Sequence, residues 1–268
     1  MGDSQTVEAR LSQWQTLHDL GKRAGTQKFH REIIRIFREH FDCSQPVESV
    51  TDQAVQDFAI KVTHFCPSRW NALVTVLRFV THRGALLKRR KLRFREFNPP
   101  SAQEFSRLLA ECDKLRQSRA GLVVRFLALT GLRFGEAKRL RWEHVHADRI
   151  EVAAGVSKNG KARSVPFLPG TAEVLQRLRD APGRNGLVLP KPNVRRGLVK
   201  ACARAGLKFL SYHSFRHTFA TRCIESGVDL PTVARWLGHQ DGGALLSRMY
   251  FHLLDEHSRT MAARVKIV

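Results

Sequence analysis

The sequence predicts a mainly helical protein of the α+β class, with one small β-hairpin and two domains joined by a basic linker. Apolar residues recur at spacings of three and four along most of the chain, which is the period of an amphipathic helix. Residues 149–167 instead indicate two extended segments around an Asn-Gly turn. Pro99 and Pro100 follow a dense basic run and interrupt helical structure, so the domain boundary is expected there.

Residues 1–90 indicate a small domain of about four or five helices. Its apolar residues fall on three helical faces: Leu11/Trp14/Leu17/Leu20, Phe29/Ile33/Ile34/Phe37 and Trp70/Leu73/Val74/Leu77/Val80. We expect the Trp and Phe side chains of this domain to pack in its core and not to stack on nucleic-acid bases.

Residues 91–100 are the predicted linker, and residues 101–268 are the predicted second domain. Ser101 with Glu104 has the pattern of a capping box that starts a helix. Further helices are expected near residues 102–117, 119–130, 134–140, 171–180, 192–205, 214–226, 231–238 and 243–250. The hairpin is expected to pair residues 149–152 with 162–167 through a tight turn at 157–161.

Composition narrows the class of protein before any motif is considered. The 268 residues are 43% hydrophobic, which excludes wholesale disorder, and no apolar run approaches the ~20 residues of a membrane span. The first residues lack the features of a secretory signal. The cysteines are scattered and indicate neither disulfides nor zinc: Cys43, Cys66, Cys112, Cys202 and Cys223. We expect a cytoplasmic, nucleoid-associated protein without membrane contact.

The net charge is +22, and both predicted domains carry a share of it. Residues 1–95 have a net charge of +8 and residues 96–268 of +14, so a basic tail does not explain the total. This favours nucleic acid as the partner, although a ribosome-associated protein would have a similar charge. The densest basic run lies at the linker and consists of Lys88, Arg89, Arg90, Lys91, Arg93 and Arg95. We expect these residues to bind DNA. The alternatives are a solvated charged loop and a localisation signal.

Three segments combine residues that suit phosphate chemistry. In T-G-L-R-F-G-E, Arg133 follows a glycine turn and Glu136 lies three residues later, where a carboxylate can orient the guanidinium. In H-S-F-R-H, His213 and Arg216 share a helical face and can converge on one anion. His213 and His217 have the spacing of a zinc helix, but serine stands where the metalloprotease motif has glutamate, so no metal is expected.

The third segment is W-L-G-H, which ends at His239 and precedes Tyr250 by eleven positions. The chain has two tyrosines, and Tyr250 is a better candidate for a phenolic nucleophile than Tyr212, which directly precedes His213. In S-K-N-G-K, Lys158 lies at the predicted hairpin tip, where an exposed turn lysine without a catalytic role is the alternative interpretation.

Taken in order, these segments together with R-M-Y-F-H-L resemble the tyrosine recombinase (phage integrase) family over residues 100–255. The resemblance implies a helical core-binding (SAM-like) DNA-binding domain at 1–90 and a catalytic domain with a C-terminal tail at 101–268, which together form a C-shaped clamp. It implies a catalytic set, with Tyr250 as nucleophile and with Glu136 and His217 in support: Arg133, Lys158, His213, Arg216, His239 and Tyr250. Within this set the family pattern makes Lys158, and not the neighbouring Lys161, the general acid.

The resemblance also implies partners and a reaction. The expected activity is site-specific DNA cleavage and rejoining through a 3′-phosphotyrosyl intermediate, with no metal, ATP or other cofactor. The expected partners are double-stranded DNA at recombination sites and three further copies of the chain in a synapsed homo-tetramer, with room for an accessory DNA-bending protein.

Two other functions fit parts of the pattern. A type IB topoisomerase-like enzyme would use a similar set of residues on a single duplex as a monomer. A non-catalytic DNA binder would use residues 214–238 as a helix-turn-helix, but it would leave Arg133, Lys158 and Tyr250 without a role.

Overall fold

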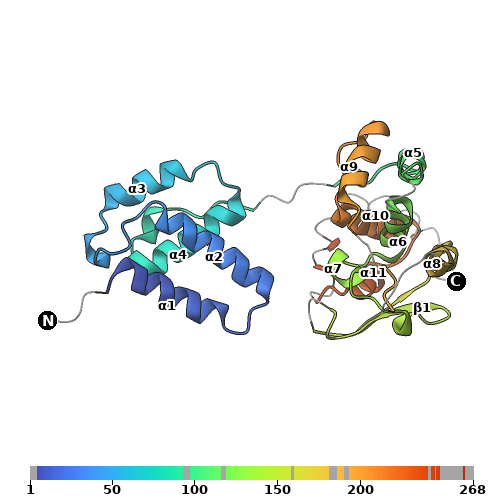
Figure 1. Cartoon of the computed structure of the whole chain (residues 1–268), viewed down its shortest axis with the longest axis horizontal. Coiled ribbons are helices and arrows are strands. Elements are labelled where there is room, and N and C mark those ends of the chain that lie inside the picture. The colour runs from blue at the N-terminus through green and yellow to red at the C-terminus, as the bar shows by residue number, and fades with distance from the viewer. Residues whose placement is uncertain are drawn as a thin grey trace. The chain divides into compact units, whose positions relative to one another are not determined.

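The computed structural model describes residues 5–92, 97–115, 119–157, 160–180, 186–189 and 193–240, together with residues 243, 244, 246, 247 and 262. The chain divides into two compact units, residues 1–94 and 95–268 (Figure 1). Each unit buries its own set of apolar side chains and so has its own core. None of the helices in the described ranges is long and apolar enough to cross a membrane.

Unit 1 consists of helices joined by short turns. Its elements are α1 (Val7–Asp19), α2 (Ala24–Arg38), η1 (Val47–Ser49), α3 (Asp52–Lys61), α4 (Pro67–Thr81) and η2 (Gly84–Leu86). The helix starts follow local sequence, because the hydroxyls of Thr6 and Thr51 accept N–H groups from the first turns of α1 and α3. Pro67 opens α4, where its missing N–H costs nothing.

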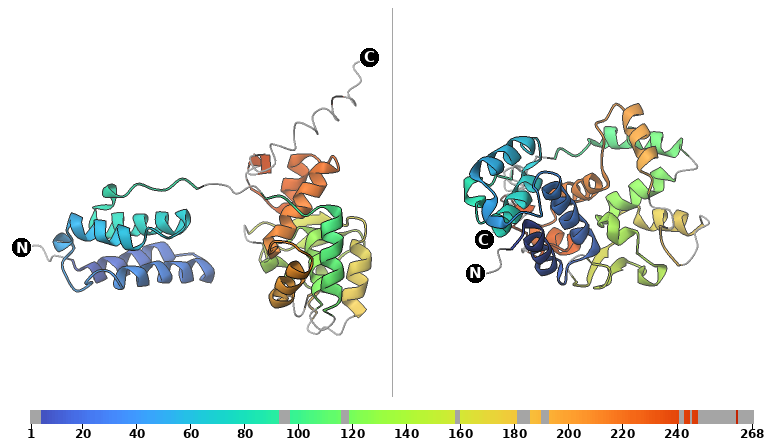
Figure 2. Two further views of the ribbon diagram at one scale, coloured as in Figure 1. Left: turned by 90° about the horizontal axis from the view of Figure 1, so that it is seen from above. Right: turned by 60° about the vertical axis from the view of Figure 1, so that its left-hand side comes forward.

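The core of unit 1 lies between α1, α2 and α4, with α1 against both of the others (Figure 2). Trp14 and Trp70 are buried there, which confirms the expected core role of these aromatic side chains. Each fully buried Leu, Ile or Phe contributes roughly 1.5–3 kcal/mol. The predicted face of α1 is only half correct, because Leu17 and Leu20 are 52% and 69% exposed. They lie off the face of α1 that Val7, Leu11 and Trp14 turn toward the core.

Unit 2 combines helices with one two-stranded sheet. Its elements are α5 (Ala102–Asp113), α6 (Ala120–Thr130), α7 (Phe134–Ala137), η4 (Trp142–His144), β1 (Arg149–Val152), β2 (Arg163–Pro166), α8 (Thr171–Asp180), α9 (Arg195–Arg204), α10 (Tyr212–Glu225) and α11 (Leu230–Leu237). The predicted capping box of Ser101 and Glu104 is present at the start of α5. The helix expected to end near Leu140 ends at Ala137.

The core of unit 2 is centred on α6 and α10, which pack against each other. Phe126 from α6 and Phe215 and Phe219 from α10 are fully buried between them. α5 and α8 pack on α6, and α10 also contacts α11. This packing fixes the end of α6, the start of α10 and the end of α11, which carry the candidate site residues.

The sheet pairs β1 with β2 in antiparallel register, with Ile150 opposite Val165 and Val152 opposite Arg163. The two strands were expected here, and their bounds agree with the predicted ones to within one residue. Residues 153–162 connect them, and Lys158 and Asn159 of the predicted tight turn lie outside the described residues. The N–H of Ser157 bonds the carbonyl of Ala153 at 3.0 Å, so part of this connection forms a helical turn. Gly160 has φ +69°, as an Asn-Gly turn signal leads one to expect.

Candidate active site

Arg133 is held in place by the turn between α6 and α7. Gly131 ends α6 in the left-handed region at φ +59°, and a Cβ there would lie 2.5 Å from the ring of Phe219, so both the conformation and the close approach require glycine. Glu136 accepts the backbone N–H of Arg133 at 2.9 Å and its guanidinium at 3.1 Å. The predicted pairing of these two residues is therefore present in the structure.

Glu136 is a buried carboxylate whose charge is compensated. Burial alone would raise the pKa of Glu136, but the hydrogen bonds and charge of Arg163, followed by those of Arg133, outweigh it and hold the pKa below its ordinary value. The carboxylate is therefore ionised at neutral pH, and it can orient guanidinium groups.

Arg163 was not anticipated from the sequence. From β2 it donates to both oxygens of Glu136 at 3.0 and 2.7 Å, and its Nε donates to the carbonyl of Trp236 at 2.8 Å. The signal that could have found it is the two-residue period of a strand. Because Val165 faces the core, Arg163 on the same face must be buried too, and a buried arginine needs a partner.

Arg216 lies on α10 and is 3% exposed. Its guanidinium donates to the carbonyl of Gly131 at 2.8 Å and to that of Leu237 at 2.6 Å. These carbonyls end α6 and α11, where a helix carries partial negative charge. The contacts join the end of α6, the first half of α10 and the end of α11.

His213 and His217 lie one turn apart on α10, with their ring centroids 4.5 Å apart in an edge-to-face arrangement. Burial, followed by the charges of Arg216 and Arg133, lowers the pKa of His213. Burial, followed by the proximity of His213, Arg216 and His239, lowers the pKa of His217 to about 4. His217 is therefore neutral at physiological pH. Within the described ranges, no group of three His, Cys, Asp or Glu side chains is arranged to hold a metal ion.

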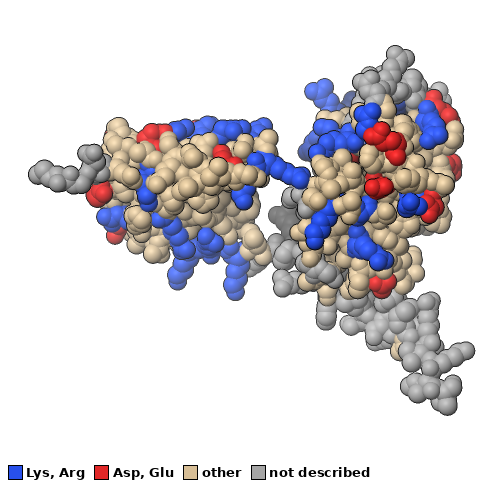
Figure 3. All heavy atoms as spheres, turned by 90° about the horizontal axis from the view of Figure 1, so that it is seen from below, with Lys and Arg blue, Asp and Glu red and all other residues tan. Residues whose placement is uncertain are grey.

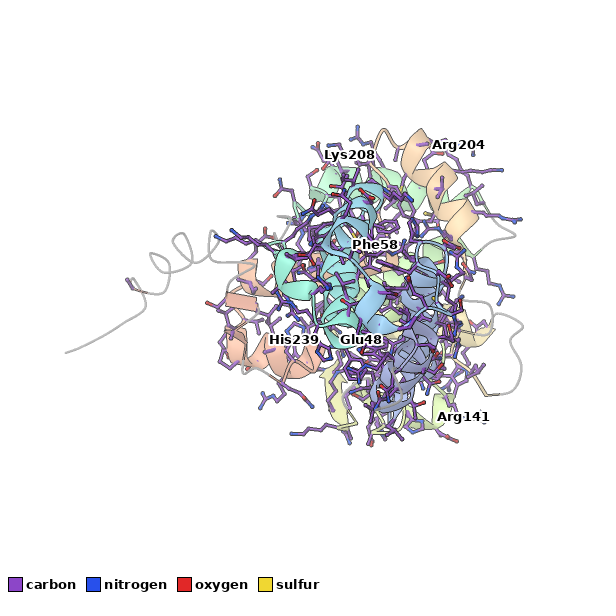
Figure 4. The ribbon with its side chains drawn as sticks, turned by 90° about the vertical axis from the view of Figure 1, so that its left-hand side faces the viewer. Glu48, Phe58, Arg141, Arg204, Lys208 and His239 are labelled. Atoms are coloured by element: carbon purple, nitrogen blue, oxygen red, sulfur yellow. The ribbon has the colours of Figure 1, made fainter. Side chains whose placement is uncertain are left out.

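His239 directly follows Gly238, which ends α11 at φ +68° (Figure 4). The backbone N–H of His239 bonds the carbonyl of Ala234 at 2.9 Å and closes this turn. The guanidinium of Arg133 reaches the carbonyl of Gly238 at 3.4 Å. A cavity of about 290 Å³ opens beside His239, and Lys161, Arg163 and Arg235 are among the side chains that line it.

Tyr212, the rival nucleophile, has its hydroxyl committed elsewhere. The hydroxyl accepts the N–H of Val194 at 2.8 Å and donates to the side-chain oxygen of Asn193 at 3.2 Å. Its ring stacks on Phe134 with centroids 3.9 Å apart. Burial is the main cause that raises the pKa of Tyr212, which disfavours the phenolate that a nucleophile needs.

The structure thus brings together Arg133, Glu136, His213, Arg216, His217 and His239, and adds Arg163. Lys158 and Tyr250 lie outside the described residues, as do Arg93 and Arg95 of the basic run.

The rest of the basic run belongs to unit 1. Lys88 and Lys91 are exposed, and the Arg89 guanidinium donates to the hydroxyl of Thr75 at 3.0 Å. Arg90 instead braces the unit. Its guanidinium donates to the carbonyls of Thr63 and Phe65 and lies 3.9 Å from the centre of the Trp70 ring. Figure 3 shows Lys and Arg side chains spread over the drawn face of each unit.

The sequence of unit 2 matches that of a known family. The model of the phage integrase family matches residues 101–257, which is more than half of the chain. The chain therefore belongs to the phage integrase family, the family of the tyrosine recombinases.

Curated relatives support the same assignment. The tyrosine recombinase XerD of Lacticaseibacillus casei is 29% identical over 175 residues, 59% of this chain and 59% of the relative. XerD of Neisseria meningitidis serogroup B is 32% identical over 170 residues, 57% of each chain, and XerC of Rickettsia bellii is 35% identical over 124 residues, 41% of this chain and 40% of the relative. The chain thus spans less than two thirds of the length of these relatives.

Solved structures share the fold. A lambda integrase(75-356) dimer bound to a COC' core site has a TM-score of 0.72 at 16% identity, covering 88% of this chain and 96% of the other. The Tn1549 transposon integrase in complex with transposon right end DNA has a TM-score of 0.74 at 17% identity, covering 97% of this chain and 99% of the other. At these identities, the likeness concerns the fold.

Proposed function

We propose that the protein is a site-specific DNA recombinase that cuts and rejoins DNA through a covalent link to tyrosine, without a metal ion or ATP. The observation that carries the proposal is that two arginines and two histidines from three segments of unit 2 lie close together. Arg133 follows α6, His213 and Arg216 lie on α10, and His239 follows α11. Membership of the phage integrase family supports the same activity.

The arginines suit a phosphodiester because the transition state concentrates negative charge on the non-bridging oxygens. Arg133 and Arg216 would donate to those oxygens, and guanidinium remains charged at any working pH. His213 and His239 would add directional donors. Loss of one such preorganised donor costs about 3–4 kcal/mol of transition-state stabilisation by analogy with oxyanion holes.

In the proposed reaction, the oxygen of Tyr250 attacks the phosphorus, and the bond from phosphorus to the 5′ oxygen breaks. The products are a 3′-phosphotyrosyl link and a 5′-hydroxyl. The tyrosine loses its proton, and Lys158 supplies one to the leaving oxygen. The reverse reaction rejoins the strand without external energy, because the covalent link conserves the phosphodiester bond energy. Tyr212 is a poor alternative nucleophile, since its hydroxyl bonds Val194 and Asn193.

The proposal assigns most of the positive charge to double-stranded DNA. Residues 1–90 would be a core-binding domain, residues 91–100 a basic linker and residues 101–268 the catalytic domain. Lys88, Arg89, Lys91, Arg93 and Arg95 remain candidates for phosphate contacts, whereas the contacts of Arg90 support a structural role. A homo-tetramer on two duplexes and a cytoplasmic, nucleoid-associated location complete the proposal. The tetramer is supported by a solved structure of the same fold, a lambda integrase tetramer bound to a Holliday junction.

The test is covalent capture. The full chain is incubated with nicked duplexes of randomised core sequence, and protein–DNA adducts that survive denaturing detergent are recovered and sequenced. We expect an adduct enriched in one core sequence, its loss in Tyr250→Phe and its retention in Tyr212→Phe. Absence of any covalent adduct with the wild type would exclude both the recombinase and the topoisomerase-like activity. Adducts without sequence preference, combined with relaxation of unrelated plasmid, would instead identify a topoisomerase-like activity.

A further inference from the structure

We infer that Arg163 is a positioning residue of this active site, which holds Glu136 and the turn before His239 so that Arg133 stays directed at the substrate phosphate. The inference deepens the proposed function and rests on it for the identity of the substrate. It is carried by the contacts that Arg163 makes from β2 with α7 and with the end of α11.

The carboxylate of Glu136 is shared between two arginines. One oxygen accepts Arg163 at 3.0 Å and the Arg133 guanidinium at 3.1 Å, and the other accepts Arg163 at 2.7 Å and the Arg133 backbone N–H at 2.9 Å. Arg163 takes the two-pronged pairing, so Arg133 makes a single side-chain bond to the carboxylate. Without Arg163, the Glu136 carboxylate would accept two hydrogen bonds from the guanidinium of Arg133, and the same N–H groups would then be lost to a phosphate.

Arg163 also fixes the turn that precedes His239. Three consecutive carbonyls accept from three different arginines: Trp236 from Arg163, Leu237 from Arg216 and Gly238 from Arg133. The side chain of Arg163 passes so close to Gly238 that a Cβ there would lie 2.9 Å from it. Movement of Arg163 would therefore reach both Arg133 and the residue that follows Gly238.

Other charged groups near Glu136 are engaged elsewhere. Arg139, His144 and Glu151 line a small hollow that Glu136 also lines. The guanidinium of Arg139 donates to the carbonyls of Gly135 and Val156, and Glu151 pairs with His146 at 3.2 Å. Arg163 and Arg133 bond the Glu136 carboxylate.

The test compares Arg163→Met and Arg163→Lys with Arg149→Met, a matched control on β1 whose arginine pairs at the surface with Asp148 at 2.9 Å. Single-turnover cleavage and DNA affinity are measured on folded protein. We expect Arg163→Met to bind DNA normally and to cleave about 100-fold more slowly, the order of loss that a displacement of about 1 Å causes. Arg163→Lys restores the charge but not the fork geometry, so it should recover part of the rate.

Two further measurements separate positioning from simple destabilisation. If Arg163 acts through Glu136, the double variant of Arg163→Met and Glu136→Gln should cleave no more slowly than Arg163→Met alone. The cleavage rate of Arg163→Met should also fall more steeply at acid pH than that of the wild type, because the Glu136 carboxylate protonates more readily once it has lost its main partner. Adding Glu136→Gln should remove this pH dependence. Cleavage by Arg163→Met equal to that of the Arg149→Met control, or additive losses in the double variant, would overturn the inference.

A readout without DNA keeps the inference distinct from the proposed function. The NMR signal of the Arg133 guanidinium, assigned with Arg133→Lys, should shift in Arg163→Met and not in Arg149→Met. If the wild type formed no covalent adduct, the proposed recombinase would fail while this signal still decided whether Arg163 positions Arg133. An unchanged Arg133 signal would refute the positioning role.

Discussion

Replacing Gly131 by alanine should destabilise unit 2 and impair the active site together. The residue has φ +59°, and an L-residue in this left-handed conformation costs roughly 1–2 kcal/mol. The new Cβ would lie 2.5 and 2.8 Å from ring atoms of Phe219 and 3.0 Å from a methyl carbon of Leu237, and overpacking of this kind costs about 1–3 kcal/mol. Together the free energy of unfolding should fall by about 2–5 kcal/mol.

The measurement is urea unfolding, with Gly135→Ala as the matched control. Gly135 lies in the next turn, has an ordinary φ, and a Cβ there meets nothing within 4 Å. The control should therefore keep or slightly gain stability. The carbonyl of Gly131 accepts Arg216 at 2.8 Å, so the variant that still folds should also cleave slowly. Unfolding free energies of the two variants that agree within about 0.5 kcal/mol would refute the steric argument.

Three more predictions follow from contacts outside that turn. Tyr212→Phe should keep the covalent adduct and lose only about 1 kcal/mol of unfolding free energy from the bonds to Val194 and Asn193; loss of the adduct would reassign the nucleophile. The pKa of His217 is about 4 in the folded protein and near 6.5 when unfolded, so the unfolded state binds more protons between these values. Stability should therefore fall as pH drops from about 6.5 to about 4, and His217→Gln should flatten this part of the urea-unfolding profile; an unchanged slope would contradict the assignment. Arg90→Ala should destabilise unit 1 by about 1–3 kcal/mol through its bonds and its contact with Trp70, whereas Lys91→Ala should leave stability unchanged and reduce the salt dependence of DNA binding. Equal losses of unfolding free energy in Arg90→Ala and Lys91→Ala would argue against a structural role for Arg90.

The parts of the site that could be predicted are those that sequence spacing determines. Arg133 and Glu136 meet because three residues on a helical turn bring them together, and His213 and His217 meet for the same reason on α10. The capping box at Ser101 is likewise a local pattern. Each of these features depends on residues within one turn of one another, so a single sequence is enough to find them.

The missed features depend on contacts between distant segments. Arg163 bonds Glu136 and Trp236, and neither is close to it in sequence. The register of the hairpin follows from burial of Ile150, Val152 and Val165, and the turn signal at Asn159-Gly160 does not determine it. Leu17 and Leu20 are exposed because the neighbouring helices cover the face of α1 that carries Val7, Leu11 and Trp14, and these two leucines lie off that face.

The balance of charge in the site explains how an acidic residue is compatible with the proposed binding of phosphate. Two of its arginines, Arg163 and Arg216, are almost completely buried, and a buried guanidinium costs several kcal/mol unless it is paired. Arg216 is bonded by carbonyls at the ends of α6 and α11, whose dipoles orient it without removing its charge. Arg163 takes the main pairing with Glu136, which offsets one positive charge. The three arginines of the site therefore keep an excess of positive charge over the single carboxylate. This excess lies on Arg133 and Arg216, the two arginines that family resemblance assigns to the phosphate.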